Sequence, residues 1–248
     1  MKEGNIVLLI AKDVSYLTEI RKGKLHTQDG IFDLNELKKK SFGEKIKTHL
    51  KKEFVIVKPN IVDILEKKAK RLPQIIMPKD VGLIIAYTGI SPDSLVVDAG
   101  TGSGFLAIFL ANYVRLGKVV TYEKNKKFAK IAKENISLSG LTNIKLKQKD
   151  IMKGIDEKNV DLITLDMKDA EKVIGHAYKA LKPGGWLVVY SPYIEQVISV
   201  VKEIEKKNFS NVKTIENMVR EWQIKEGARP KTIGIMHTGW LTFARKVG

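Results

Sequence analysis

The residues best suited to chemistry form a glycine-rich turn in the middle of the chain. Asp98-Ala99-Gly100-Thr101-Gly102-Ser103-Gly104 follows the apolar run Leu95-Val96-Val97, and an apolar helix is expected over residues 105–114. Glycines at alternate positions let a backbone approach a ligand closely and leave amide N–H groups at a helix N-terminus. The turn therefore predicts a ligand-binding site between a buried strand and a helix.

The spacing of the glycines separates two kinds of ligand. A nicotinamide fingerprint is G-x-G-x-x-G, and starting it at Gly100 would require glycine where this chain has Phe105. Acid-x-G-x-G-x-G resembles instead the S-adenosylmethionine (SAM) loop of Rossmann-type methyltransferases. A nicotinamide-dependent oxidoreductase is thereby disfavoured. The residues expected to bind SAM here are Asp98, Gly100, Gly102, Ser103, Gly104, Phe105 and Leu106.

Acidic residues end the strands that are expected after this turn. Glu123 ends a strand over residues 119–123, where a carboxylate accepts hydrogen bonds from ribose hydroxyls. Asp150 follows a strand over residues 144–148 and suits the amino group of an adenine. One such residue alone is more often an ordinary polar strand end. The ordered set of Asp98, Glu123 and Asp150 predicts SAM binding.

A further carboxylate, Asp166, ends the strand expected over residues 160–165. In a doubly wound methyltransferase this edge of the sheet faces the transferred methyl group and its acceptor, so Asp166 is assigned to both catalysis and cofactor binding. It can accept a hydrogen bond from an exocyclic amine or from the ammonium group of methionine. The alternatives are a solvated loop residue and the N-cap of a helix over residues 170–180.

The elements that must position these residues alternate from Leu95 onward. Strands are expected over 95–98, 119–123, 144–148, 160–165 and 186–190, helices over 105–114, 126–139, 170–180 and 194–207, and a closing pair of strands over 212–224 and 237–246. Such alternation specifies a mostly parallel, doubly wound sheet. The predicted fold is α/β, with a seven-stranded Rossmann-like methyltransferase sheet in a domain of residues 71–248.

The first part of the chain, residues 1–70, is expected to form a separate small β-rich domain with a basic surface. Its short β-like runs are punctuated by turns, and a connecting helix capped by Asn60 is expected over residues 61–70. A proline-bounded connector then leads to an apolar helix over residues 81–88, for which Asp80 is the expected N-cap.

Composition limits the classes of function. The 248 residues carry a formal net charge of +16 spread over the whole chain, which suggests a polyanionic partner, although a Lys-rich solvated surface is the alternative.

The absence of Cys excludes disulfides, thiolate metal sites and cysteine nucleophiles, and the four His have no metal-ligand spacing, so no metal site is expected. With no apolar stretch long enough for a membrane span and no signal peptide, a cytoplasmic protein without membrane contacts is expected.

Several segments together resemble the tRNA adenine N1-methyltransferases that modify position 58 of the T-loop, in particular their archaeal type. The glycine turn matches the SAM loop of that family, and the similarity spans nearly the whole chain. The other segments that carry it are Gln74-Ile75-Ile76-Met77-Pro78-Lys79-Asp80, Tyr122-Glu123, Leu165-Asp166, Lys182-Pro183-Gly184-Gly185, Tyr190-Ser191-Pro192 with Gln196, Glu221-Trp222, Arg229-Pro230 and His237-Thr238-Gly239-Trp240.

The resemblance implies methyl transfer from SAM to N1 of adenine 58 in tRNA, with adenine 57 as a further target, by a homotetramer. It implies catalytic roles for Asp166 and Tyr190, although a core aromatic is the alternative for Tyr190. The substrate-binding residues that it implies are Met77, Lys79, Arg229 and His237. N1 of adenine has its own lone pair, so alignment of acceptor and donor is the main demand and no covalent enzyme intermediate is needed.

Two departures from the family pattern bear on the choice of target. Met77 stands where relatives have Tyr or His, and Lys168 stands where many have Pro. Three alternatives stay open: a SAM enzyme that acts on another RNA site, one that acts on a small molecule, and a tRNA-binding subunit without catalysis.

Overall fold

A computed structural model describes residues 1–72, 75–224, 227–232, 234 and 237–248. Gln74, which opens one of the motifs above, lies outside the described residues. The chain divides into two compact units, Met1–Lys70 and Arg71–Gly248. Each unit is built around cores of its own, one in the first and two in the second.

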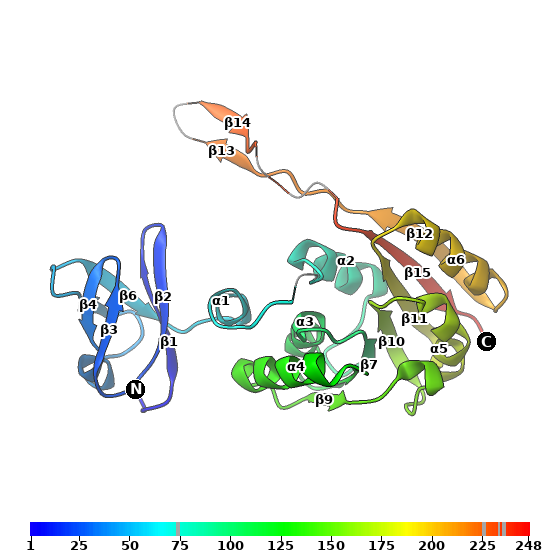
Figure 1. The fold of residues 1–248 in the computed structure, drawn as a ribbon, viewed down its shortest axis with the longest axis horizontal. Helices are drawn as coiled ribbons and strands as arrows, with labels where there is room; N and C mark the ends of the chain where they lie inside the picture. Colours follow the sequence, from blue (N-terminus) through cyan, green and yellow to red (C-terminus); the bar gives the residue numbers. More distant parts are fainter. Residues whose placement is uncertain (73–74, 225–226, 233, 235–236) are drawn as a thin grey trace. The chain divides into compact units, whose positions relative to one another are not determined.

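The first unit is rich in β-structure. It contains β1 (Ile6–Ala11), β2 (Val14–Glu19), β3 (Lys24–Thr27), β4 (Gly30–Asp33), the short 3-10 helix η1 (Leu34–Lys39), β5 (Lys45–Lys47), β6 (Glu53–Val57) and α1 (Ile61–Lys67). Four strands form an antiparallel sheet in the order β2-β1-β6-β5, and β3 pairs with β4 as a hairpin (Figure 1). Phe32 and Phe54, whose ring centroids lie 5.0 Å apart, are central to its apolar core.

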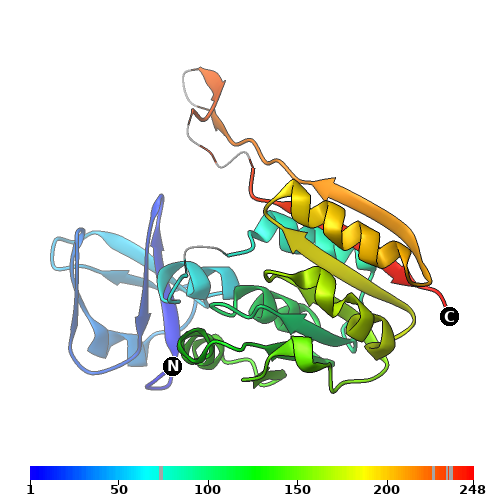
Figure 2. The same cartoon turned by 45° about the vertical axis from the view of Figure 1, so that its right-hand side comes forward.

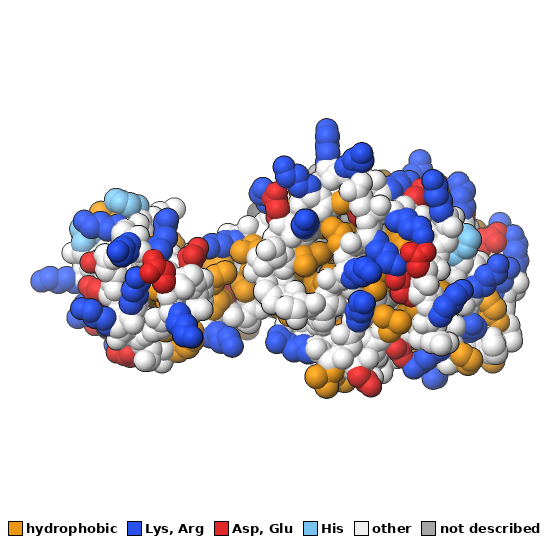
Figure 3. Space-filling model, turned by 90° about the horizontal axis from the view of Figure 1, so that it is seen from below, with side chains coloured by type: hydrophobic (Ala, Val, Ile, Leu, Met, Phe, Trp, Pro, Cys, Tyr) orange, Lys and Arg blue, Asp and Glu red, His pale blue; other side chains and the backbone are white. Residues whose placement is uncertain are grey.

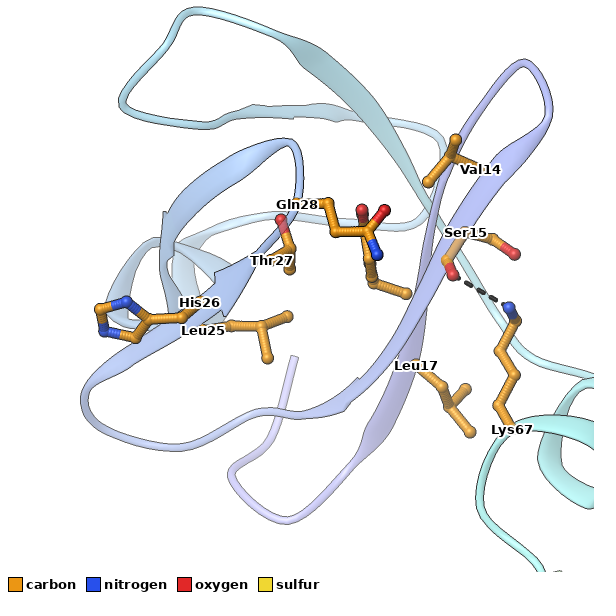
Figure 4. Close-up of a pocket in the computed structure, with 9 residues that line it drawn as sticks. Val14, Ser15, Leu17, Leu25, His26, Thr27, Gln28 and Lys67 are labelled. Atoms are coloured by element: carbon orange, nitrogen blue, oxygen red, sulfur yellow. Dashed lines mark hydrogen bonds between the residues drawn. The ribbon is translucent and has the colours of Figure 1, made fainter.

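The helix α1 begins where the sequence predicts, because Asn60 and Asp63 form a reciprocal capping box. It ends at Lys67, earlier than predicted. An open hollow of about 780 Å³ lies between β2 and β3 of the same unit (Figure 4). At its rim the ammonium of Lys67 donates to the carbonyl of Ser15 (2.9 Å), which ties α1 to the edge strand β2.

The second unit contains the doubly wound sheet. Its elements are α2 (Pro78–Thr88), β7 (Leu95–Ala99), α3 (Phe105–Tyr113), β8 (Lys118–Tyr122), α4 (Lys126–Ser139), β9 (Ile144–Lys147), η2 (Ile151–Lys153), β10 (Val160–Leu165), η3 (Ala170–Val173), α5 (Ile174–Ala180), β11 (Leu181–Ser191), α6 (Ile194–Glu205), β12 (Phe209–Glu216), β13 (Trp222–Ile224), β14 (Ala228–Pro230) and β15 (Trp240–Lys246). The seven strands follow the order β12-β15-β11-β10-β7-β8-β9. Among the described strands of this sheet, β15 alone runs against the others: its pairs with β11 and β12 are antiparallel, and the remaining four pairs are parallel. The predicted fold class is thereby confirmed.

Neighbouring residues of each central strand serve opposite faces of the sheet. Val96 and Val119 pack in a core with residues of α2 and α3, whereas Val97 and Val120 pack with residues of α5 and α6 (Figure 2). Both faces are covered by helices, and for this reason the strands read as continuous apolar runs. The carboxyl ends of the parallel strands are left to carry the functional residues.

Some predicted boundaries are wrong. Asp80 is not an N-cap, because α2 already begins at Pro78, whose fixed φ suits the first helical position, with Met77 as the cap residue. Residues 212–224 do not form one strand of a closing pair. β12 ends at Glu216, and residues 222–224 belong to β13, which pairs with β14 in a separate hairpin. In the described part of the chain, no helix has the length and apolarity to cross a membrane.

Candidate functional site

The loops after β7 and β10 meet at the carboxyl edge of the sheet, where the chain switches from one side of β7 to the other. The backbone N–H of Asp166 donates to the carbonyl of Ala99 (2.8 Å). A Cβ added to Gly100, which has a φ of +84°, would stand 1.8 Å from the carbonyl oxygen of Asp166. The close approach that requires glycine here is between two loops of the protein. The contact of Gly100 with a ligand, expected from the sequence, stays a prediction.

Asp98 is buried beneath these loops and holds the neighbouring strands. Its two carboxylate oxygens accept hydrogen bonds from the hydroxyls of Thr121 (2.6 Å) and Thr164 (2.7 Å). The hydroxyls of Thr121 and Thr101 lie 2.6 Å apart, which extends the network into the glycine turn. Burial raises the pKa of Asp98, an effect that both threonine hydrogen bonds oppose. Asp98 therefore holds the glycine turn in place through the hydroxyls of Thr121 and Thr101.

Glu123 fixes the turn from the side. Its carboxylate accepts hydrogen bonds from the backbone N–H of Gly102 (2.9 Å) and of Asn125 (2.8 Å), one at each oxygen. A carboxylate oxygen has lone pairs for more than one donor. Glu123 is therefore held at the end of β8 in an orientation that leaves acceptor capacity for hydroxyl groups of a ligand.

The turn also presents polar groups that the protein does not satisfy. Ser103 is buried, and its Oγ has no hydrogen-bond partner in the described part of the chain. The helical bonds of α3 begin with Ile108 N–H to the carbonyl of Gly104 (2.9 Å), so the amides of Phe105 and Leu106 lie at the N-terminus of the helix, where intrahelical acceptors are lacking. Buried polar atoms normally have a partner. The orphaned hydroxyl and the helix N-terminus thus fit a polar or anionic part of a ligand.

A small cavity of about 70 Å³ lies beside Glu123. It is lined by Gly100, Tyr122, Glu123, Lys124, Lys149, Asp150, Ile151 and Met167. The side chain of Asp150 accepts from the backbone N–H of Met152 (3.0 Å) and so caps η2 at the wall of the cavity. The cavity therefore combines the predicted ribose acid and the predicted adenine acid, and the donors and acceptors around the turn fit SAM.

Asp166 lies at the same edge with a different environment. Its carboxylate is partly buried and has no hydrogen-bond partner among the residues that the structure describes. Burial, with a further contribution from the charge of Asp98, raises the pKa of Asp166 to about 7. An acceptor without a partner and with a strongly raised pKa is typical of a site that receives a polar ligand group.

Tyr190 is the last residue but one of β11, the strand beside β10. Its hydroxyl donates to the carbonyl of Thr238, and its ring packs against Gly239. Burial is the largest cause of a raised pKa at Tyr190, and the charges of Asp80 and Asp166 add to it. The ring is thus fixed near the Asp166 carboxylate by the segment that leads into β15.

Lys79 is predicted from the sequence to bind substrate. In the structure all three donors of its ammonium group bond to other groups of the protein. Its ammonium bonds to the Asp80 carboxylate (2.8 Å), to the carbonyl of Asn217 (2.6 Å) and to the hydroxyl of Thr238 (2.8 Å). Asp80 is buried and Lys79 is 13% exposed. Since a lysine ammonium has three donors, none is left for a phosphate in this arrangement. We call these four residues the clasp, because they join α2 to the ends of β12 and β15.

A groove of about 640 Å³ borders the clasp. Its lining consists of Met77, Pro78, Lys79, Val219, Arg220, Glu221, Lys231, Thr232, Gly234 and Thr238. The ring of His237 is held nearby: its Nδ1 lies 2.5 Å from a carboxylate oxygen of Glu216, which raises the pKa of His237. Arg229 is exposed on β14 and is not part of the groove lining. The structure therefore places Met77 at the groove and Arg229 on the hairpin.

Comparison with known proteins decides between the classes that this geometry allows. The family model described as "tRNA methyltransferase complex GCD14 subunit" matches residues 66–232. That match covers more than half of the chain and includes the glycine turn, Glu123, Asp150, Asp166 and Tyr190. The chain belongs to this family. The predicted family is thereby confirmed.

Curated and solved relatives agree with membership of the GCD14 family. The chain is 38% identical to the tRNA (adenine(57)-N(1)/adenine(58)-N(1))-methyltransferase TrmI of Methanocaldococcus jannaschii, over 93% of this chain and 90% of the relative. A SAM-dependent O-methyltransferase from Thermotoga maritima is 35% identical, with a TM-score of 0.90 over 100% of this chain and 95% of that one. The tRNA (m1A58) methyltransferase TrmI of Aquifex aeolicus is 27% identical, with a TM-score of 0.83 over 100% and 99%. The fold of this GCD14 family member is thus the Rossmann-like methyltransferase fold.

Several residues that shape the site of this family member were missed at the sequence level. Thr121 and Thr164 hold Asp98, Asn125 braces Glu123, and Asn217 completes the clasp. The threonines carry one available signal, since each is a polar residue inside an otherwise apolar strand. Asn125 carries another, because it is an N-cap residue two positions after the strand-ending acid. Asn217 carries no local signal, because its partner Lys79 is remote in sequence.

Proposed function

We propose that this chain transfers a methyl group from SAM to N1 of adenine at position 58 of the tRNA T-loop, with adenine 57 as a second candidate target. The observation that carries the proposal is the Asp166 carboxylate, which has no hydrogen-bond partner among the described residues and lies beside the glycine turn, at the edge of the sheet where methyltransferases of this fold work. The names of the Methanocaldococcus jannaschii and Aquifex aeolicus relatives supply the substrate and the position.

The glycine turn and the adjoining strand ends hold SAM, which when bound supplies a methyl group on a positively charged sulfur. Glu123 accepts from the ribose hydroxyls, and Asp150 from the adenine amino group. The amides of Phe105 and Leu106 and the hydroxyl of Ser103 face the polar methionine portion, where a helix N-terminus favours a carboxylate. Two observations support these roles: the Ser103 hydroxyl has no partner among the described residues, and the Glu123 carboxylate keeps acceptor capacity beside its bonds to Gly102 and Asn125.

Asp166 orients the acceptor. Its carboxylate accepts a hydrogen bond from the N6 amino group of the target adenine, which directs N1 and its lone pair toward the cofactor edge. N1-methylation leaves a positive charge on the base, and a carboxylate nearby stabilises that charge as it develops. Tyr190 packs against the target adenine once that base has turned out of the tRNA. The Tyr190 hydroxyl donates to the carbonyl of Thr238, which keeps the ring in place. The remaining demand is alignment with exclusion of water.

The substrate side consists of the groove and the hairpin. Met77 supplies an apolar wall for the base or for a neighbouring nucleotide, and His237, which precedes the groove residue Thr238, adds a ring that Glu216 holds. Arg229 on the exposed hairpin contacts a phosphate. The role of Lys79 is indirect, through the clasp, since its donors are occupied. Because the substrate is tRNA, we also propose an RNA-binding, cytoplasmic protein, and a homotetramer as the family resemblance implies.

The test is a methylation assay with purified protein, labelled SAM and unmodified tRNA transcript, followed by digestion to nucleosides and mass spectrometry. We expect 1-methyladenosine that maps to position 58 or 57. A transcript with guanine at both positions is the matched control and should stay unlabelled. Label on another nucleoside would point to a different RNA site, and absence of any label together with absence of SAM binding would support a non-catalytic subunit.

A second candidate, methyl transfer to a hydroxyl group, is favoured by one observation. The Thermotoga maritima protein, which matches this chain over its whole length, is named a SAM-dependent O-methyltransferase. The same assay therefore includes free adenosine and catechol as small acceptors. Methylation of catechol without methylation of tRNA would replace the proposed function by O-methylation of a small molecule.

A further inference from the structure

The helix α4 carries a dense row of lysines on its outer surface. Lys126, Lys130 and Lys133 recur at spacings of four and three residues and share one side of the helix, and Lys127 lies beside them. All four are exposed, as is Lys124 just before the helix. None of the five has an ion-pair partner in the part of the chain that the structure describes. We call them the α4 lysines. Figure 3 shows, on the face of the larger unit seen from below, many Lys and Arg side chains and fewer Asp and Glu side chains.

The α4 lysines do not help the helix to form. The first turn of α4 contains no acidic residue, although negative charge is what stabilises a helix N-terminus. Lys126 and Lys127 instead put positive charge there. Lys126 and Lys130, and Lys130 and Lys133, are like-charge neighbours on the helix surface, and each pair opposes helix formation. A charge pattern that opposes local stability is expected where a surface serves a partner.

The helix on the opposite face of the sheet shows that this pattern is not general. In α6, Glu195, Glu203 and Glu205 alternate with Lys202, and Lys206 just after the helix pairs with Glu203. A Lys-rich surface that served only solubility would be mixed in the same way on both helices. α4 has one acidic residue, Glu134, against four lysines, so the positive charge is concentrated on α4.

The α4 lysines continue into the candidate site. The helix begins three residues after Glu123, and its cap residue Asn125 donates its backbone N–H to the Glu123 carboxylate (2.8 Å). Lys124 lines the same cavity as Gly100 and Asp150. In the sheet, β8 is separated from β10 only by β7, so the end of β8 is about 10 Å from the end of β10 that carries Asp166. A polyanion along α4 would thus pass close to the acceptor position.

We propose that the α4 lysines form a docking surface for the phosphate backbone of the tRNA substrate; this inference rests on the proposed function. Successive lysines of the row lie about 4.5–6 Å apart along the helix axis, from a rise of about 1.5 Å per residue. Ammonium groups on flexible stems suit a sequence-independent phosphate contact. The surface fixes how the T-arm is presented and leaves the recognition of adenine to Asp166.

The experiment compares two triple variants of the full-length protein. Lys126→Gln/Lys130→Gln/Lys133→Gln removes the row, and Lys202→Gln/Lys206→Gln/Lys207→Gln removes the same charge from the α6 side. Binding of unmodified tRNA is measured by filter retention at several salt concentrations. For the α4 variant we expect about tenfold weaker binding near 0.1 M salt and a salt slope smaller by about two, since each lost phosphate contact removes about 0.7–0.9 from the slope. The α6 variant should bind like the parent protein.

Three further measurements separate the possible reasons for a change. Lys126→Arg/Lys130→Arg/Lys133→Arg should retain binding, because charge and not lysine is required. SAM affinity and the thermal midpoint of the Gln variant should be unchanged or higher, because the row opposes helix stability. Two results would contradict the proposed docking surface. One is equal tRNA binding by the parent protein and the α4 Lys→Gln variant, and the other is a change in the oligomeric state of that variant without a change in its salt slope. Neither result would touch the proposed function, which fails only if the parent protein does not methylate tRNA.

Discussion

The ammonium nitrogen of Lys79 lies 2.8 Å from the hydroxyl oxygen of Thr238, although one residue opens α2 and the other precedes the last strand. The same ammonium neutralises the buried Asp80 carboxylate, and Thr238 in turn accepts from Tyr190 through its carbonyl. The Lys79 ammonium therefore links the start of the second unit (Arg71–Gly248) to both ends of the segment that carries the β13–β14 hairpin, and Thr238 extends the link to Tyr190.

Breaking the Lys79–Asp80 ion pair is expected to destabilise the second unit. Lys79→Met leaves the Asp80 carboxylate buried without its counter-charge, and we expect the free energy of unfolding to fall by about 3 kcal/mol. Urea unfolding followed by fluorescence measures it. The matched control is Lys79→Met/Asp80→Leu, which leaves no uncompensated charge and should be more stable than Lys79→Met alone. The opposite result, weaker tRNA binding by Lys79→Met with an unchanged unfolding curve, would show that Lys79 contacts phosphate and does not stabilise the clasp.

Gly100 is expected to tolerate no side chain. Gly100→Ala puts a Cβ 1.8 Å from the Asp166 carbonyl at a φ of +84°, so the two loops must separate. We expect loss of SAM binding by calorimetry and a lower thermal midpoint. Gly82→Ala is the control: Gly82 lies inside α2 with open space at its Cβ position, so alanine should raise stability by about 0.5–1 kcal/mol. Normal SAM affinity in Gly100→Ala would show that the loops can move apart without cost.

Asp166 is expected to make methyl transfer dependent on pH. With a pKa of about 7, its carboxylate is mostly protonated in acid, so kcat/KM should rise as the pH increases through 7 and then level off. Asp166→Asn keeps an acceptor oxygen but loses the charge; we expect about 100-fold lower kcat with no rise near pH 7. Asp166→Ala removes both and should be weaker still. A parent profile that is flat from pH 6 to pH 8 would contradict the assignment.

The same group has the opposite effect on stability. Because the pKa of Asp166 is raised in the folded state, folding favours the protonated acid, and this contribution is lost as the pH rises from the ordinary carboxyl range toward 7. Above pH 7 the charged side chain opposes folding, so Asp166→Asn should unfold at a higher temperature than the parent at pH 8, by the equivalent of about 1–4 kcal/mol. At pH 4 the difference should nearly vanish. Thermal unfolding at both pH values, with intact secondary structure by circular dichroism, is the measurement.

Glu123 is expected to act on the cofactor and not on the RNA. Glu123→Gln removes the charge that strengthens hydrogen bonds from ribose hydroxyls, and we expect at least about tenfold weaker SAM binding by calorimetry. Affinity for tRNA should stay the same. Glu203→Gln on α6 removes an equivalent charge from the surface and serves as the control. Unchanged SAM affinity in Glu123→Gln would mean that Glu123 only holds the turn, through its hydrogen bonds with Gly102 and Asn125, and does not bind the cofactor.

The parts of this protein that were predictable from sequence depend on local patterns. Alternating apolar runs and helical periodicity predicted the doubly wound sheet, and Asn60 as an N-cap predicted the start of α1. The errors occurred where a local pattern has two readings. Asp80 looks like an N-cap until Pro78 is recognised as a first helical residue, and residues 212–224 look continuous until the pairing of β12 with β15 stops at Glu216.

By itself, the sequence determined which strand ends carry acids and where the chain must turn, because side-chain type and glycine position act within a few residues. Only the tertiary structure decided what each group is free to do. It showed Gly100 pressed against Asp166, the donors of Lys79 consumed by Asn217 and Thr238, and the Asp166 carboxylate without a partner among the described residues. Whether a polar group is satisfied depends on contacts between segments far apart in sequence, and those exist only once the chain has folded.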